Sequence, residues 1–440
     1  MNNDVQAVVT DLPRSLPTNV GTYELITSNT WKWALLFAYF AIVVDGIDIM
    51  LLSYSLTSLK TAFGLLTLQA GALGSASLAG MGIGGILGGW ACDKFGRVRT
   101  IAHSVTFFSV ATCLLGFTQT FEQFMALRFI GALGIGALYM ACNTLMAEYV
   151  PTSYRTTVLG TLQTGQTVGY IVATILAGAI IPDHGWRVLF FITVIPAAIN
   201  IFLRRFVPEP KSWQLTKIQS LTLSAEKTTI QIETPQSNNR SIYQQIFTNL
   251  KHRKMFLLWM TTAFFLQFGY YGINNWMPSY LETELHMNFK SLTSYMVGSY
   301  TAMILGKILA GYLADKFNRR AVFVFGTLAS AIFLPVIIFF NTPDNILYLL
   351  ITFGFLYGIP YGVNATYMAE SFSTDVRGTA IGGAYNIGRV GAAIAPATIG
   401  FLASGGTFAS AFIVMGAAYF IAGVLPGIFI RDRQYDPQKS

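Results

Sequence analysis

The sequence predicts an all-α membrane protein with twelve transmembrane helices in two six-helix bundles, and three observations predict this fold. Of the 440 residues, 53% are hydrophobic and 11% are charged, whereas about 25% are charged in soluble domains. Apolar runs long enough to cross a hydrocarbon core of about 30 Å recur from end to end. The two halves of the chain also share an internal repeat.

Runs of about 20 apolar residues place six helices in each half. In the first half we expect them over residues 33–56, 68–92, 99–118, 122–147, 156–181 and 187–206. In the second half we expect them over residues 254–278, 290–314, 320–341, 346–370, 378–404 and 407–430. The stretch between is rich in Ser, Thr, Gln, Asn and Lys, a composition that cannot bury itself. The prediction is an N-terminal bundle over 1–206, a linker loop over 207–253 and a C-terminal bundle over 254–440.

The distribution of basic residues predicts the orientation. Twelve spans put both termini on one side, and most of the 28 Lys and Arg residues fall in the termini and loops of that side. By the positive-inside rule this side is the cytoplasm, at a cell (inner) membrane. The net charge of +8 follows this topology, so we exclude nucleic acid as a partner. The three cysteines lie in separate apolar stretches, which indicates no disulfide and no metal site.

The internal repeat relates the halves at a fixed offset of 222 residues. After the second span of each half, a loop motif recurs as Gly89, Asp93, Lys94, Phe95 and Arg97, then Gly311, Asp315, Lys316, Phe317 and Arg319. After the fourth span, Glu148 and Arg155 recur as Glu370 and Arg377. Two bundles related by a parallel repeat are the plan of a transporter that rocks around a central site.

The repeated loop also carries a family resemblance. The stretch from Gly89 to Arg99, Gly-Trp-Ala-Cys-Asp-Lys-Phe-Gly-Arg-Val-Arg, resembles the signature of the major facilitator superfamily. The stretch from Arg128 to Gly136 in span four resembles a second signature, common among proton-coupled members. The second copy of the loop has Asn318 where the first has glycine. The resemblance covers nearly the whole chain, and it implies that spans one, four, seven and ten line the cavity.

Charged residues beside these loops indicate a gate. Carboxylates and arginines meet at the cytoplasmic helix ends of both halves, and such pairs can hold that face closed and break when it opens. The gating candidates are Gly89, Asp93, Arg97, Glu148, Arg155, Asp315, Arg319, Glu370 and Arg377. The alternative is that they form ordinary surface ion pairs, each worth little. We favour the gate because both copies keep both signs in register.

Charges inside spans mark a pathway, because a charge at the bilayer centre costs about 3 kcal/mol or more. Asp45 and Asp48 lie midway along span one, three residues apart and so on one helix face. Two carboxylates that close disfavour simultaneous ionisation, which suits a proton carrier. The rise of 1.5 Å per residue puts Asp48 and Arg128 at matching depth in one bundle. We expect an Asp48–Arg128 pair that proton binding weakens; the alternative is that both aspartates are structural.

Arg389 lies near mid-membrane on the opposite bundle, where it can grip an anionic substrate with two parallel hydrogen bonds. Spans seven and ten carry aromatic and amide side chains that can stack on a planar ring. The substrate-binding candidates are Arg389, Tyr270, Asn274, Tyr361 and Asn364. We expect Trp276 and Tyr280 to lie in an aromatic belt at the outer boundary. We expect Lys307 to extend to the headgroups, with no role in the site.

Three short motifs narrow the resemblance. Together they resemble the aromatic acid:proton symporter family: Asp45-Gly-Ile-Asp48, Asn275-Trp276-Met-Pro278 and Gly388-Arg389-Val-Gly391. That family imports benzoate-type acids, hydroxylated benzoates and related acids such as muconate with protons. The resemblance implies a transporter that imports a small organic, aromatic-type carboxylate by alternating access. Its partners are the acid anion, protons and the lipid bilayer, with no cofactor and a monomeric functional unit.

Other functions stay open. A sugar or polyol porter is the main rival, because the stretch from Glu148 to Arg155 resembles a loop motif of sugar porters. A neutral sugar, however, gives no reason to hold Arg389 at mid-membrane. A drug:proton antiporter binds cationic substrates, so its site would carry carboxylates without that arginine. A transporter-like sensor would need a signalling domain. An enzyme is not expected, because the sequence has no metalloprotease, nucleophile-elbow or phosphate-loop motif.

Overall fold

The computed structural model describes residues 30–150, 152–210, 213–214, 246–373, 376–405 and 407–432, except for the side chains of residues 147, 152–157 and 378. The helices of the first half are α3 (Thr30–Phe63), α4 (Thr67–Phe95), α5 (Arg97–Leu115), α6 (Phe121–Tyr149), α7 (Thr152–Phe191) and α8 (Val194–Arg204). Those of the second half are α11 (Leu250–Thr283), α12 (Phe289–Lys316), α13 (Arg319–Phe340), α14 (Ile346–Ala369), α15 (Arg377–Ala403) and α16 (Ala409–Phe429). Among these helices, eleven are long and apolar enough to cross a membrane, and α8 is shorter.

The predicted spans 156–181 and 187–206 are separated where expected, and the second of them has an additional break. α7 runs on to Gly185, whose φ of 75° favours glycine, and a second helical stretch begins there. That stretch breaks again before Pro196, whose missing N–H cannot bond the carbonyl of Ile192. The N–H of Ile195 instead bonds Ile192, three residues back, at 3.0 Å. Residues 186–204 therefore form one span of about 28 Å in two pieces, which explains why α8 is short.

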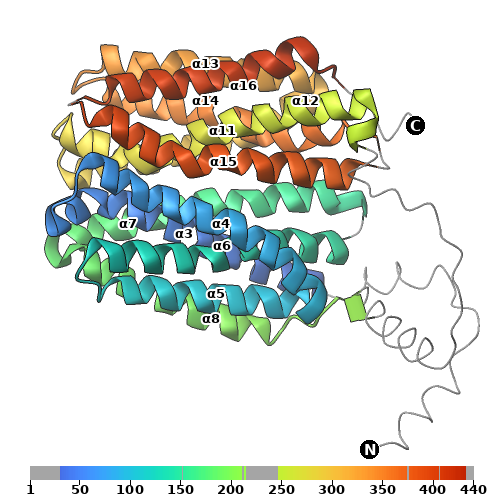
Figure 1. Cartoon of the computed structure of the whole chain (residues 1–440), viewed down its shortest axis with the longest axis horizontal. Coiled ribbons are helices and arrows are strands. Elements are labelled where there is room, and N and C mark those ends of the chain that lie inside the picture. Colours follow the sequence, from blue (N-terminus) through green and yellow to red (C-terminus); the bar gives the residue numbers. More distant parts are fainter. Residues whose placement is uncertain are drawn as a thin grey trace, which may run out of the picture.

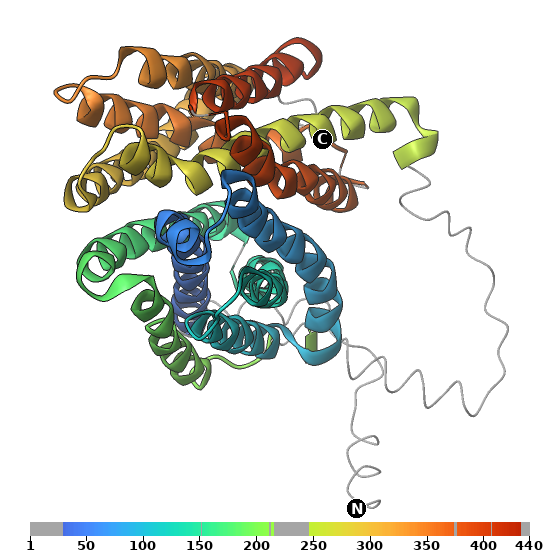
Figure 2. The same ribbon diagram turned by 60° about the vertical axis from the view of Figure 1, so that its left-hand side comes forward.

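The two halves form two bundles that lie side by side. Figure 1 shows α3–α8, in blue to green, beneath α11–α16, in yellow to red, and Figure 2 shows the same two groups from a second direction. The bundles meet mainly along two lines of contact, which we call seams: α4 packs against α15, and α7 packs against α12. We call the helix ends at Phe95 and Lys316 the motif end, because both repeated loops lie there, and the opposite ends the far end.

Within each bundle, glycines bring helices into backbone contact. A Cβ placed on Gly84 of α4 would clash with the carbonyl of Leu133 in α6. A Cβ on Gly306 of α12, at the same position of the repeat, would clash with the carbonyl of Phe355 in α14. Lipid supplies no hydrophobic force between helices, so their association depends on such close packing. The repeat therefore joins the corresponding pair of helices in both bundles.

At the far end, small residues close both seams. Gly71 of α4 faces Gly400 of α15, with 3.4 Å between the Cα of Gly71 and a Cβ placed on Gly400, and a Cβ on Gly71 would clash with Pro396. In the other seam, a Cβ on Gly178 of α7 would lie 2.7 Å from Oγ1 of Thr293 in α12. The two bundles are in direct contact at this end.

Toward the motif end, both seams open. A glycine lies five helical turns from each of the four packed positions, Gly71, Gly400, Gly178 and Thr293. Because a turn has 3.6 residues, each of these glycines is on the same helix face as its packed position. These glycines are Gly89, Gly160, Gly311 and Gly382. In the described part of the chain, no atom beyond the glycine's own helix backbone and chain neighbours lies within 4 Å of a Cβ placed on any of them. In the part of the chain that the structure describes, the bundles thus part toward the motif end.

Candidate functional site

Asp48 and Arg128 form a buried ion pair inside the first bundle. Nη1 of Arg128 donates to Oδ2 of Asp48 at 2.7 Å, and the two side chains are only 3% and 2% exposed. Ser77 accepts from Nε of Arg128 at 2.9 Å, and Thr112 donates to Oδ1 of Asp48 at 2.5 Å. The pair expected from helix depth is therefore present and fully hydrogen-bonded. Ser77 and Thr112 were not predicted, because a hydroxyl on an apolar helix carries no distinctive sequence signal.

Asp45 lies one turn from Asp48 toward the motif end, in a different environment. Its side chain is buried, and neither carboxylate oxygen makes a hydrogen bond of normal geometry with a described residue, although the Gln166 amide lies nearby. Arg389 of the other bundle and Arg128 act on it through space. Among the described residues, Asp45 is thus a buried carboxylate without an ion pair, and both Arg389 and Arg128 influence it.

Arg389 extends from α15 across the α4–α15 seam. Its guanidinium lies 5.5 Å from the ring centre of Tyr139 in α6 and 5.9 Å from that of Tyr385 in its own helix. Nη1 lies 3.5 Å from a Cβ placed on Gly85 of α4, and it is buried without a hydrogen-bond partner in the described part of the chain. Tyrosine faces attract a cation but leave its N–H groups free. Arg389 can therefore still donate to an anion.

The tyrosines of α11 and α14 pack against one another. The rings of Tyr270 and Tyr357 are parallel, with 5.5 Å between their centres. The hydroxyl of Tyr270 donates to the hydroxyl of Tyr170, in α7 of the first bundle, at 3.2 Å. Nδ2 of Asn274 donates to the hydroxyl of Tyr357 at 2.6 Å. Tyr361 pairs its hydroxyl with that of Tyr419 in α16 at 2.6 Å. These groups therefore bond mainly to each other.

Asn364 lies apart from this cluster. It is half-buried near the motif end of α14, and its side chain makes no hydrogen bond to a described residue. Two residues expected in an aromatic belt are instead packed inside the protein: Trp276 is 0% exposed and Tyr280 is 1% exposed. Nε1 of Trp276 donates to the carbonyl of Pro396 at 2.9 Å, which ties α11 to α15. The belt prediction was wrong because the rings face neighbouring helices, which sequence position alone does not reveal.

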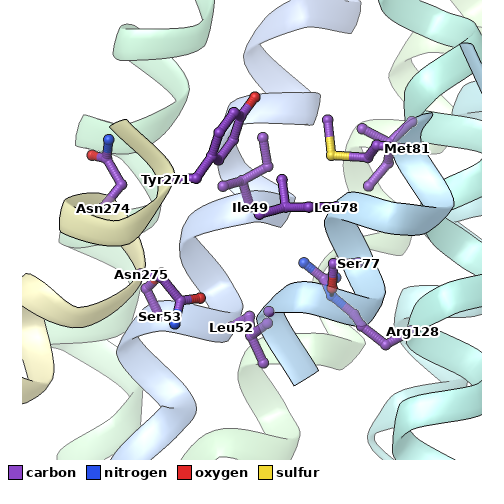
Figure 3. Close-up of a pocket in the computed structure, with 12 residues that line it drawn as sticks. Ile49, Leu52, Ser53, Ser77, Leu78, Met81, Arg128, Tyr271, Asn274 and Asn275 are labelled. Carbon is purple, nitrogen blue, oxygen red and sulfur yellow. Dashed lines mark hydrogen bonds between the residues drawn. The ribbon is translucent and has the colours of Figure 1, made fainter. Parts of the chain in front are cut away.

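Figure 3 shows a small, partly open pocket between the first bundle and α11. α11 contributes Tyr271, Asn274 and Asn275, and the first bundle contributes Arg128 and mostly apolar side chains of α3 and α4. Of the predicted substrate-binding residues only Asn274 lines it. Tyr271 was missed because its neighbour Tyr270 has the same residue type, and the helix rotation that separates them is not visible in sequence.

The loop charges pair within each bundle. In the first half, the Arg97 guanidinium lies 2.8 Å from Glu148 and 3.4 Å from Asp93. The second half repeats the arrangement with Arg319, Glu370 and Asp315, at 3.0 and 3.1 Å. Each of these pairs joins elements of one bundle, so each stabilises the motif end of its own bundle.

The other gating candidates are placed differently. Gly89 lies in the open part of the α4–α15 seam. The side chain of Arg155 lies outside the described residues. Arg377 donates from Nε to the carbonyl of Phe372 at 3.2 Å, at the start of α15.

Lys307 does not extend to the headgroups. Its Nζ donates to Oγ1 of Thr167, in the other bundle, at 2.8 Å. The expectation failed because helix rotation, which sequence depth does not give, turns Lys307 toward α7 at the seam.

Comparison with known proteins identifies the family of this chain. The profile of the Major Facilitator Superfamily matches residues 38–300 and 291–440. The cis,cis-muconate transport protein of Acinetobacter baylyi is 64% identical over 94% of this chain and 98% of that protein. The benzoate transport protein of Acinetobacter baylyi is 27% identical over 86% of this chain and 84% of that protein. These relatives confirm the resemblance to aromatic acid transporters.

Among solved structures, a D-xylose-proton symporter matches with a TM-score of 0.74 over 92% of this chain and 99% of that chain. At 20% identity this match supports the fold alone. The chain is therefore a multi-pass membrane transporter of the major facilitator superfamily and not an enzyme.

Proposed function

We propose that this transporter imports cis,cis-muconate, or a closely similar unsaturated or aromatic carboxylate, together with protons. The observation that carries the proposal is the buried Arg389 guanidinium, whose Nη1 has no hydrogen-bond partner in the described part of the chain. The other deep arginine, Arg128, is fully paired. The 64% identical relative, named a cis,cis-muconate transport protein, supplies the choice of acid.

An anionic substrate explains Arg389 better than a neutral sugar does. A buried charge without a counter-ion is costly in a membrane, and a carboxylate that accepts two of its N–H groups offsets that cost. A sugar leaves the charge uncompensated. The tyrosine faces around Arg389 suit the flat, conjugated chain of muconate, because π systems stack on one another.

Asp45 is the proposed proton carrier. It is buried without a hydrogen bond of normal geometry or an ion pair among the described residues, so gaining a proton breaks no such bond. Asp48 would lose its pair with Arg128, and we assign that pair the role of holding α3 to α6. Import against an inside-negative potential costs about 2.3 kcal/mol per negative charge at 100 mV. Two protons, one of them carried by Asp45, cancel this term for a dianion, and the pH gradient supplies the remaining drive.

The seams support alternating access. We assign the motif end to the cytoplasm because the basic residues gather there, so the structure corresponds to an inward-facing state. In the outward-facing state, Gly89 would meet Gly382 and Gly160 would meet Gly311, as Gly71 meets Gly400 at the far end. The ion pairs of the loop motifs would keep each bundle rigid during this motion, with the segment over 207–253 as the linker between the bundles.

Uptake assays test the proposal. Cells that express the chain are given labelled cis,cis-muconate, benzoate, 4-hydroxybenzoate, protocatechuate, nicotinate or a sugar, with and without a protonophore. We expect muconate to accumulate, the protonophore to abolish accumulation and Arg389→Gln to abolish uptake. Arg253→Gln, at an exposed arginine near the start of α11, is the control and transports normally. Uptake of the sugar alone, or normal acid uptake by Arg389→Gln, would contradict the proposal.

A further inference from the structure

Lys307 has a fixed place between the bundles. Its Nζ bonds the buried Thr167 across the α7–α12 seam at 2.8 Å. On its other side, α12 packs against α14 without a gap: a Cβ on Gly362 would clash with the carbonyl of Lys307, and one on Gly358 would lie 3.2 Å from its nitrogen. Since this packing fixes the rotation of α12, the lysine faces the space between the bundles.

The internal repeat relates Lys307 to Arg389. The offset of 222 residues converts Gly85 into Lys307 and Thr167 into Arg389. In one seam Arg389 lies against Gly85, and in the other Lys307 lies against Thr167. Each cation therefore contacts the residue that corresponds to the other cation. By the pseudo-two-fold symmetry of the bundles, the two cations lie at the same depth on opposite sides of the centre.

Both cations lie where the seams begin to open. Arg389 is about two turns from Gly382, and Lys307 is about one turn from Gly311, the open positions of their helices. Farther along the same face of α12, Tyr300 is buried and packs on Tyr170 of the other bundle at 5.4 Å between ring centres. A molecule that enters from the motif end thus meets both cations before it reaches closed packing.

Neither cation forms an ion pair in the described part of the chain, although Asp45 acts on Arg389 through space. The ion pairs found there involve Arg97, Arg128 and Arg319, and no carboxylate lies within 4 Å of Arg389 or Lys307. A hydroxyl satisfies one N–H of Lys307 but does not neutralise its charge. A substrate with one carboxylate can compensate only one of the two cations.

We propose that Lys307 binds the second carboxylate of the substrate, so that a dicarboxylate spans the centre from Arg389 to Lys307. The inference rests on the proposed function and deepens it, because it makes the site selective for acids with a carboxylate at each end. Arg389 grips one end with its planar fork, and Lys307 attracts the other as a point charge. The conjugated chain between them lies at the level of Tyr139 and Tyr385.

Binding to purified full-length protein tests the inference. Ligand-induced thermal stabilisation gives apparent Kd values for cis,cis-muconate and for its monomethyl ester, which has one carboxylate. We expect the wild type to bind muconate about tenfold or more tightly than the ester, a difference of about 1.4 kcal/mol. Lys307→Gln should reduce that affinity ratio to about one without weakening the binding of the ester. Lys307→Arg should keep the wild-type ratio. Lys290→Gln, at an exposed lysine of the same helix, is the matched control and leaves the ratio unchanged.

Two results overturn the inference alone: a ratio in Lys307→Gln equal to that of the wild type, or an equal loss of affinity for both ligands, which indicates a structural role. Absence of binding of both ligands to the wild type overturns the proposed function, and the inference with it. Arg389→Gln further separates the proposed function from the inference about Lys307, since it should weaken the binding of both ligands.

Discussion

Replacing Asp48 by Asn tests whether the buried ion pair holds the first bundle together. The charges lie 2.7 Å apart and are nearly inaccessible to solvent. At an effective dielectric constant of 20 their attraction is about 6 kcal/mol. Asn keeps the shape and part of the hydrogen bonding but leaves the guanidinium of Arg128 uncompensated. Removing one partner of a buried pair costs about 3–5 kcal/mol, and we expect a loss of that size in the free energy of unfolding.

The assay is reversible unfolding in mixed detergent micelles, followed by tryptophan fluorescence. The cycle comprises the wild type, Asp48→Asn, Arg128→Gln and the double variant, with Arg253→Gln as a surface control. The double variant leaves no isolated charge. Its loss in free energy of unfolding should therefore be smaller than the sum of the two single losses, by about 2 kcal/mol or more. Additive losses, or a loss below about 1 kcal/mol for Asp48→Asn, would refute a stabilising pair.

Three further predictions concern the seams and the loops. A disulfide between cysteines placed at Gly178 and Thr293, in a background without the native cysteines, should form readily without substrate and stop transport until reductant is added; full transport by the cross-linked protein would exclude seam opening at the far end. Gly89→Leu should leave thermal stability nearly unchanged, because the residue faces open space, yet lower the transport rate by about tenfold or more because the seam cannot close. This outcome is checked by comparing melting temperature with initial uptake rate, and normal uptake counts against the closing motion. Asp93→Asn should slow transport without lowering the amount of protein in the membrane, because Arg97 loses one of its two carboxylate partners. Unchanged uptake kinetics would show that this surface ion pair has no role in transport.

The sequence predicts those features that follow from regular helix geometry. A fixed rise per residue correctly placed Asp48 beside Arg128, although eighty positions separate them in the chain. It could not give the rotation of each helix about its own axis. That rotation decides that Lys307 points to the seam, that Trp276 is inside and that Tyr271, in place of Tyr270, lines the pocket. Rotation depends on which surfaces of neighbouring helices interlock, and the glycine contacts that fix it become visible only in three dimensions.

We assign substrate binding to Arg389 and proton transfer to Asp45, and exchange in proteoliposomes separates these two roles. Exchange of labelled for unlabelled cis,cis-muconate requires substrate binding and the rocking motion, whereas accumulation driven by a pH gradient also requires proton transfer. We predict that Asp45→Asn retains exchange, independent of pH, but loses accumulation, and that Arg389→Gln loses both. Accumulation by Asp45→Asn would show that Asp45 does not carry the proton, and exchange by Arg389→Gln at the wild-type rate would show that Arg389 does not bind the substrate.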